Sequence, residues 1–71
     1  MSEREKIEVI EDLLEVEPES LKIDSVLSEL DEWDSLAIIS LLAYFDTEYG
    51  IKLSSHDIKR FVYVKDIVDM M

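Results

Sequence analysis

The sequence predicts an all-α fold, a small four-helix bundle with three main helices, a short third helix and a long first connection. In three segments, apolar residues recur with the i, i+3, i+4 and i+7 spacing of one helix face. The chain has one glycine and one proline in 71 residues, so few positions interrupt a helix. Hydrophobic residues make up 48% of it, which favours a folded core over a disordered acidic tail. This length allows one domain, residues 1–71.

The first helix is expected over residues 2–16. Ser2, followed three residues later by Glu5, matches the pattern of a capping box. The helix must end before Pro18, because the proline ring disfavours helical geometry at the preceding residue. Its apolar face consists of Ile7, Ile10, Leu13 and Leu14.

The connection over residues 18–33 is long but not polar. Its five aliphatic residues are expected to be buried across the bundle, with a short turn of helix after Asp24 or Ser25. These residues are Leu21, Ile23, Val26, Leu27 and Leu30.

The second helix is expected over residues 35–49. Asp34 is a good N-cap, Gly50 suits a left-handed helix end, and Ile51 can supply the closing hydrophobic contact. At 100° per residue, the predicted buried face consists of Ile38, Leu41, Leu42, Phe45 and Tyr49.

The opposite face of this helix is also apolar, which is unusual for a surface helix. Leu36, Ile39 and Ala43 lie there, flanked by Ser35, Asp46 and Thr47. Scattered exposed aliphatics are common on protein surfaces. Three in register beside a helix-start serine and acidic residues favour a docking surface.

Two further helices complete the bundle. Ser54 and Asp57 form a second capping-box pattern at the start of the short third helix, whose apolar contacts are expected from Ile58, Phe61 and Val62. The fourth helix begins at Val64 or Lys65. Its apolar positions are Val64, Ile67, Val68 and Met71.

Charge limits the partners. The chain has 18 acidic and 7 basic residues, a formal net charge of −11. This charge opposes binding to nucleic acid or to an anionic membrane and favours basic protein surfaces, although acidity can also serve solubility alone.

The N-terminus does not resemble a signal peptide, and the longest uncharged run, of eleven residues, is shorter than the roughly 18 that span a bilayer. We expect a cytoplasmic monomer. Without cysteine, it has neither disulfide bonds nor thiolate metal sites.

Ser35 stands in the first turn of the second helix, near unpaired N–H donors and the positive end of the helix dipole. A phosphate ester on its hydroxyl would be favoured there.

Hydrolase chemistry is not expected, because the one histidine, His56, begins another helix, and the second helix between them spans roughly 20 Å. Asp31 and Asp34 lack the glycine and closing glutamate of a calcium loop. We expect neither an enzyme nor a metal site.

The order of these features resembles the acyl carrier protein family: helix, apolar-bearing loop, Asp34-Ser35-Leu36 at a helix start, Tyr49-Gly50-Ile51, a short helix, then Val64-Lys65-Asp66-Ile67. The likeness covers nearly the whole chain. It implies that Ser35 is esterified by 4′-phosphopantetheine, which a Mg²⁺-dependent phosphopantetheinyl transferase takes from coenzyme A. It also implies that Asp34 helps to position the transferase's metal. The helix-two positions that contact acyl-loading and acyl-using enzymes would be Leu36, Ile39, Ala43 and Asp46.

The residue before the Asp-Ser-Leu tripeptide departs from fatty-acid carriers, which usually have a small residue there. Trp33 makes the motif similar to stand-alone carriers of polyketide, nonribosomal peptide or polysaccharide pathways and to D-alanyl carriers. The cargo is therefore open between fatty acyl, polyketide, aminoacyl and sugar-modifying acyl groups. Trp33 either caps the bundle or contacts the arm or a partner.

An acidic helical inhibitor or immunity-type protein that blocks a basic enzyme is the alternative function. It has the same size, charge and helix content. It gives no reason for an Asp-Ser-Leu tripeptide at a helix start.

Overall fold

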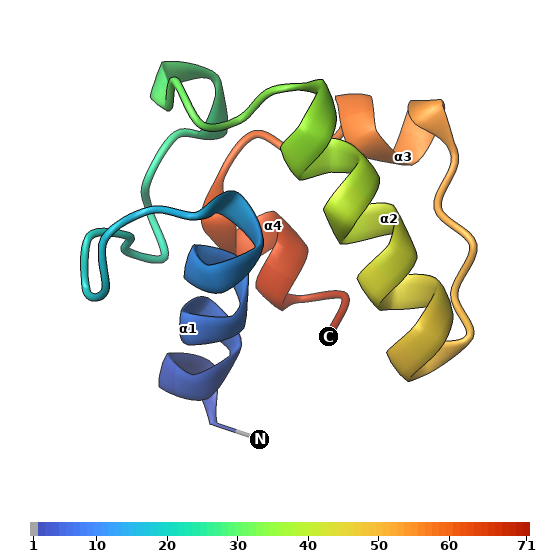
Figure 1. Cartoon of the computed structure of the whole chain (residues 1–71), viewed down its shortest axis with the longest axis horizontal. Coiled ribbons are helices and arrows are strands. Elements are labelled where there is room, and N and C mark those ends of the chain that lie inside the picture. The colour runs from blue at the N-terminus through green and yellow to red at the C-terminus, as the bar shows by residue number, and fades with distance from the viewer. Residues whose placement is uncertain (1) are drawn as a thin grey trace.

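The computed structural model describes residues 2–71 and confirms the all-α fold class (Figure 1). Its elements are α1 (Glu3–Leu14), the 3₁₀ helix η1 (Leu27–Glu29), α2 (Ser35–Tyr49), α3 (Ser55–Lys59) and α4 (Val64–Val68). Within residues 2–71 there is no strand, only an isolated antiparallel bridge between Val26 and Tyr63. None of the helices in this range has the length and hydrophobicity needed to cross a membrane. In detail, α4 is as short as α3, with five residues each.

The two longest helices begin as the sequence predicts. At α1, Ser2 Oγ accepts from the Glu5 amide at 3.2 Å, and the Glu5 carboxylate accepts from the Ser2 amide, which confirms the capping box. At α2, Asp34 Oδ1 accepts from the Ala37 amide at 3.0 Å. Both helices are therefore anchored by side chains that satisfy their first free N–H groups.

The same two helices end in left-handed residues. Glu15 follows α1 with φ 57°, so that helix stops two residues before the predicted end at Val16. Gly50 follows α2 with φ 65°, and the Ile51 amide donates to the Phe45 carbonyl at 3.1 Å. The predicted glycine stop of α2 is confirmed, because glycine adopts positive φ without steric cost.

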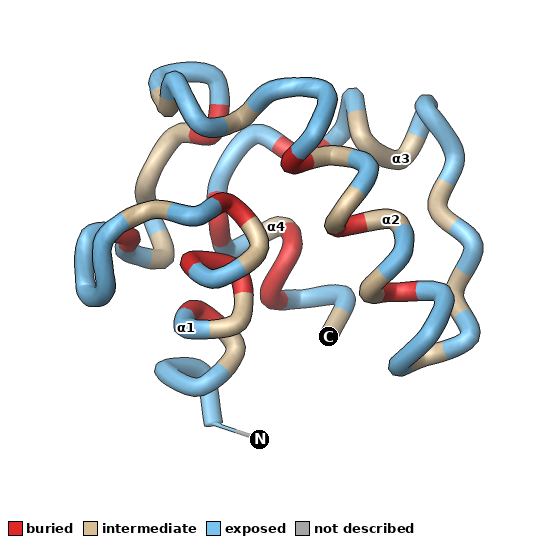
Figure 2. The backbone as a smooth tube through the Cα atoms, viewed as in Figure 1, coloured by how far each residue is buried: buried red, intermediate tan, exposed pale blue. Residues whose placement is uncertain are grey.

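The hydrophobic core lies where α1, α2 and α4 face one another, with α1 packed against both other helices (Figure 2). The long first connection and the end of α3 add residues to it. Among residues 2–71, the twelve buried hydrophobic residues are Ile7, Ile10, Leu14, Leu21, Leu27, Ala37, Leu41, Phe45, Phe61, Val64, Ile67 and Val68.

The buried face of α2 is rotated about the helix axis relative to the face that the sequence predicts. Ala37, Leu41 and Phe45 are buried, whereas Ile38 and Leu42 are only half-buried. Tyr49 is also half-buried and packs against the core. The prediction of a buried Leu42 was wrong, because α2 turns Ala37, Leu41 and Phe45 into the core and leaves Leu42 at its edge.

The long connection is pinned to the start of α4 by backbone hydrogen bonds. Its Ser25 carbonyl accepts from the Val64 amide and its Ile23 carbonyl from the Lys65 amide, both at 3.0 Å. The Leu27 amide donates to the Val62 carbonyl at 2.9 Å. The first two bonds satisfy N–H groups of the first turn of α4, which have no acceptor within the helix. All five aliphatics of the connection are buried or half-buried, and η1 supplies the predicted short turn.

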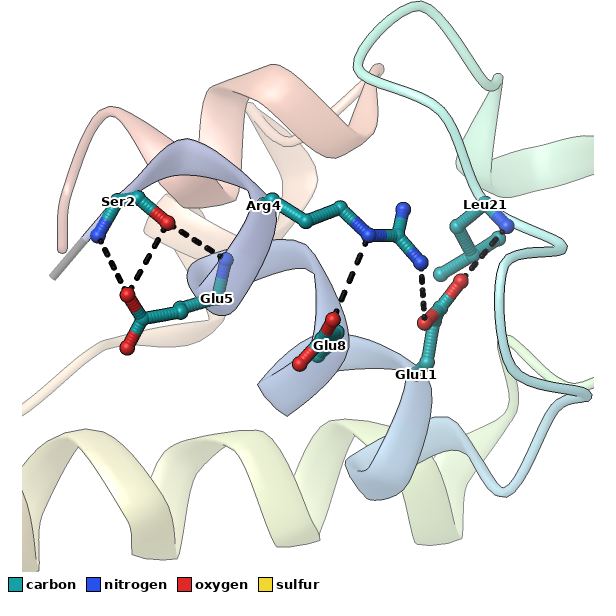
Figure 3. Close-up of polar contacts among 6 residues, drawn as sticks. All are labelled: Ser2, Arg4, Glu5, Glu8, Glu11 and Leu21. Carbon is teal, nitrogen blue, oxygen red and sulfur yellow. Dashed lines mark hydrogen bonds and ion pairs between the residues drawn. The ribbon is translucent and has the colours of Figure 1, made fainter.

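A buried carboxylate fastens this connection to α1 as well (Figure 3). Glu11 is 3% exposed; its Oε2 accepts from the Leu21 amide at 3.0 Å, and its Oε1 lies 3.6 Å from Arg4 Nη2. Arg4 also reaches Glu8, 3.5 Å away. Glu11 lies one turn from Ile7 on the apolar face of α1, and a charged residue in that position is the sequence feature that could have indicated its burial.

The short helices follow the sequence with one exception. Ser54 and Asp57 form the predicted capping box of α3, with the Asp57 carboxylate accepting from the Ser54 amide at 2.9 Å. Phe61 is buried and Ile58 half-buried. The prediction that Val62 packs inside was wrong: it is 49% exposed, because its backbone pairs with the long connection and with Asp66 and turns the side chain outward.

Candidate functional site

Ser35 is the first residue of α2, and its side chain is exposed. Within residues 2–71, no side chain or carbonyl forms a hydrogen bond with its hydroxyl. Asp34 accepts a hydrogen bond from the Ala37 amide with its side chain and another from the Ile38 amide with its backbone carbonyl, at 3.0 Å each. The amides of Ser35 and Leu36 have no partner in the described part of the chain. A free hydroxyl thus stands beside two free N–H donors at the positive end of a 15-residue helix, where an attached phosphate is favoured.

Asp34 already has one structural role, as the N-cap of α2. Only its Oδ1 is used for that role, so Oδ2 has no hydrogen-bond partner among residues 2–71. The residue is exposed, as are Asp31 and Glu32 in the loop before it. The three carboxylates form an acidic rim next to Ser35.

Trp33 points the other way from this rim. It is half-buried and packs against the hydrophobic core, and its amide donates to the Leu30 carbonyl at 3.1 Å. These contacts favour the interpretation of Trp33 as a cap of the bundle. A contact with an arm or a partner stays a hypothesis.

The outer face of α2 is open. Leu36 is 75% exposed and Ile39 60% exposed, and Ala43 and Asp46 are exposed with them. On a helical projection these four residues and Ser35 lie within about 100° of one another. The structure thus leaves uncovered every side chain that the sequence assigned to a docking surface.

Comparison with known proteins shows to which family the chain belongs. Residues 7–71 match the family model described as "Phosphopantetheine attachment site". The chain is also 30% identical over 61 residues to an acyl carrier protein of Campylobacter hominis, an alignment that covers 86% of this chain and 77% of that protein. The chain belongs to the acyl carrier protein family. No solved structure gives a significant match.

Members of the acyl carrier protein family are carriers, not enzymes, and 4′-phosphopantetheine is their covalently attached prosthetic group. They interact with phosphopantetheinyl transferases and biosynthetic enzymes. The residues at the start of α2 fit such a group, because they offer an exposed, unengaged hydroxyl next to free backbone donors. When bound, the group supplies a thiol, which this chain lacks because it has no cysteine.

His56 lies exposed in α3. The sequence argument placed it a helix length away from Ser35, but residues 51–54 run back along α2, so that α3 lies level with the first turns of α2 (Figure 1). The length of α2 therefore does not separate the two residues. Within residues 2–71, no hydrogen bond of Ser35 with His56 occurs.

Proposed function

We propose that Ser35 carries the 4′-phosphopantetheine arm and that the chain delivers acyl or related intermediates, as thioesters on that arm, to biosynthetic enzymes. The exposed, unbonded hydroxyl at the capped start of α2 is the observation that carries the proposal. The family match, which spans this position, supports it.

Loading needs little from the chain itself. The Ser35 oxygen forms a bond to phosphorus and displaces the adenosine bisphosphate part of coenzyme A, and the hydroxyl proton goes to a base of the transferase. Ser35 therefore needs exposure rather than a neighbouring base. Asp34 holds the helix start through Oδ1, and we assign its free Oδ2 to the transferase's Mg²⁺.

The outer face of α2 is the proposed docking surface. Leu36, Ile39 and Ala43 can be buried against a partner, while Asp46 and the acidic rim meet lysine or arginine. The chain is proposed to act as a cytoplasmic monomer that visits several basic enzymes in turn. The Trp33 variant of the motif supports cargo other than fatty acids, with aminoacyl groups as the second candidate.

The test is incubation of the chain with coenzyme A and a promiscuous phosphopantetheinyl transferase, followed by intact mass. We expect a gain of one phosphopantetheine group in the parent and none in Ser35→Ala. Ser55→Ala is the matched control, because Ser55 is also an exposed serine that begins a helix, and it should be loaded like the parent. A gain that survives Ser35→Ala would assign the arm to another residue.

A further inference from the structure

A groove runs along α2 on the side that faces α1. Its first part is a hollow of about 370 Å³ that begins at Asp34 and Leu36, on either side of Ser35 in the chain. Its second part is a hollow of about 510 Å³ that reaches Thr47, roughly 16 Å further along the helix. The two hollows share residues of both helices, among them Leu13 of α1, so they form one open groove. It is called the α1–α2 groove below.

The lining of the α1–α2 groove suits a ligand that is partly polar and partly apolar. Leu13, Leu36 and Ala43 line it with aliphatic groups, whereas Ser40 and Thr47 contribute hydroxyls. Within residues 2–71, neither hydroxyl forms a hydrogen bond with another side chain or with the backbone. The 4′-phosphopantetheine arm has the matching composition, because its amide groups donate and accept hydrogen bonds while its methyl and methylene groups are apolar.

Acidic residues border the groove and limit what can occupy it. Asp12, Glu15, Asp34 and Glu48 belong to its lining, and all four are exposed. These carboxylates would repel a free fatty acid or another anion. The amides of the arm carry no charge, and a thiol with an ordinary pKa of about 8.5 is largely neutral at pH 7. The part of the arm beyond its phosphate therefore meets no repulsion in the groove.

The position of Ser35 favours an attached arm over a free molecule. An open groove leaves much of a ligand in water, so a free ligand would bind it weakly. A group attached to Ser35 starts beside Leu36, at one end of the groove. Its effective concentration there is of the order of millimolar, as for any short flexible tether. Weak contacts therefore suffice to hold the arm, although they would not hold a free ligand.

We propose that the α1–α2 groove is the resting site of the 4′-phosphopantetheine arm, which runs from Ser35 past Ser40 toward Thr47 when no enzyme is bound. This inference rests on the proposed function. In the groove the arm covers Leu36 and Ala43, which also belong to the proposed docking surface of α2. An enzyme that buries these two side chains displaces the arm, because both cannot occupy the same surface. Docking thereby releases the thiol beside the enzyme that uses it.

The test compares the amide chemical shifts of ¹⁵N-labelled chain before and after loading, with intact mass as proof of the arm. The added phosphate shifts amides in the first turn of α2 wherever the arm lies. Leu13 and Thr47 are informative, because Leu13 belongs to α1 and Thr47 lies about three turns from Ser35. We expect both amides to shift on loading. Shifts confined to the first turn of α2, shifts strongest in α3, or shifts that need an added enzyme would overturn the inference.

Ser40→Tyr should abolish the shifts at Leu13 and Thr47, because the larger side chain fills the middle of the groove. Serine and tyrosine have similar helix propensities, so α2 should persist. Ser55→Tyr is the matched control, since it makes the same change in α3, none of whose residues lines the groove. It should keep both shifts. The same behaviour of the two variants would contradict the resting site, and the comparison in the parent chain does not depend on how either variant folds.

Thiol reactivity gives a second measurement. If the contacts in the groove correspond to a millimolar dissociation constant, about half of the arms rest there at any time. Iodoacetamide should then modify the thiol of the loaded parent about twofold more slowly than that of loaded Ser40→Tyr. Equal rates would contradict the inference.

The two proposals fail in different ways. If intact mass shows no arm on Ser35, the proposed function is wrong and this inference with it. If the arm is on Ser35 but the amides of Leu13 and Thr47 do not shift, only the resting site is wrong.

Discussion

The buried carboxylate of Glu11 accepts a hydrogen bond from the backbone amide of Leu21, ten residues away, at 3.0 Å. One side chain of α1 thereby fixes the entry of the long connection, whose Leu21 and Leu27 are buried in the core. The connection then supplies carbonyls to the start of α4. Glu11 thus helps to hold together the segment that leads to Ser35.

Glu11→Ala should destabilise the fold by about 1–3 kcal/mol, because it leaves the buried Leu21 amide without an acceptor. Glu11→Gln keeps an acceptor oxygen and should cost less. Urea unfolding of both variants measures the difference. Equal stability of Glu11→Ala and the parent would mean that water replaces the carboxylate at no cost.

Phe45→Ala should cost about 3–5 kcal/mol, because the ring is fully buried and its removal leaves a cavity. Since small domains have only about 5 kcal/mol of stability or somewhat more, this variant should be largely unfolded in mild urea. Leu42→Ala, at a half-buried position of the same helix, should cost clearly less. A larger loss for Leu42→Ala than for Phe45→Ala would show that α2 is rotated toward the face that the sequence predicts.

Asp46→Lys should slow the loading of Ser35 and make the remaining rate less sensitive to salt, because an exposed charge at the edge of an interface acts mainly on encounter. Leu36→Ala should weaken affinity instead, with little loss of stability, since that side chain is 75% exposed. Steady-state loading at two salt concentrations separates the two effects, with circular dichroism as the folding control. Parent-like loading by both folded variants would remove the outer face of α2 from the transferase interface.

Asp66 should contribute stability only while it is ionised. The amides of Tyr63 and Val62 donate to its Oδ2 at 2.9 Å each and lower its pKa below the ordinary 3.8. A lowered pKa in the folded state means that the contribution is complete above about pH 4 and is lost as the pH falls through the folded-state value. Asp66→Asn should therefore be less stable than the parent at neutral pH, and the difference in unfolding free energy should narrow as the pH falls below 3.8.

The control for this prediction is Asp69→Asn, which removes the same charge from an exposed residue whose side chain forms no hydrogen bond within residues 2–71. Unfolding free energies of all three proteins across this pH range provide the comparison. A gap for Asp66→Asn that is constant with pH, or equal to that of Asp69→Asn, would assign the effect to general charge.

Local features were predictable from the sequence because their causes are local. The capping boxes of Ser2 and Ser54, the N-cap at Asp34 and the stop at Gly50 each depend on residues within one turn, so the bounds of α2 and the exposed setting of Ser35 followed from the sequence. The Asp-Ser-Leu tripeptide at that helix start, together with the length, the acidity and the spacing of the later features, indicated the family that the comparisons then showed.

Packing between distant segments could not be predicted in this way. The rotation of α2 that buries Ala37 and leaves Leu42 half-exposed depends on which helix lies on each side, and helical spacing alone does not give this. The hydrogen bond between Glu11 and Leu21 joins residues that only the folded chain brings together. The same holds for the hydrogen bonds between the long connection and the start of α4, and for the position of α3 level with the first turns of α2. The sequence by itself determined the helices and the exposed serine, because short-range hydrogen bonds and periodicity specify them. The tertiary structure alone decided the rotation of α2 and the position of α3, because these depend on the path of the chain between helices.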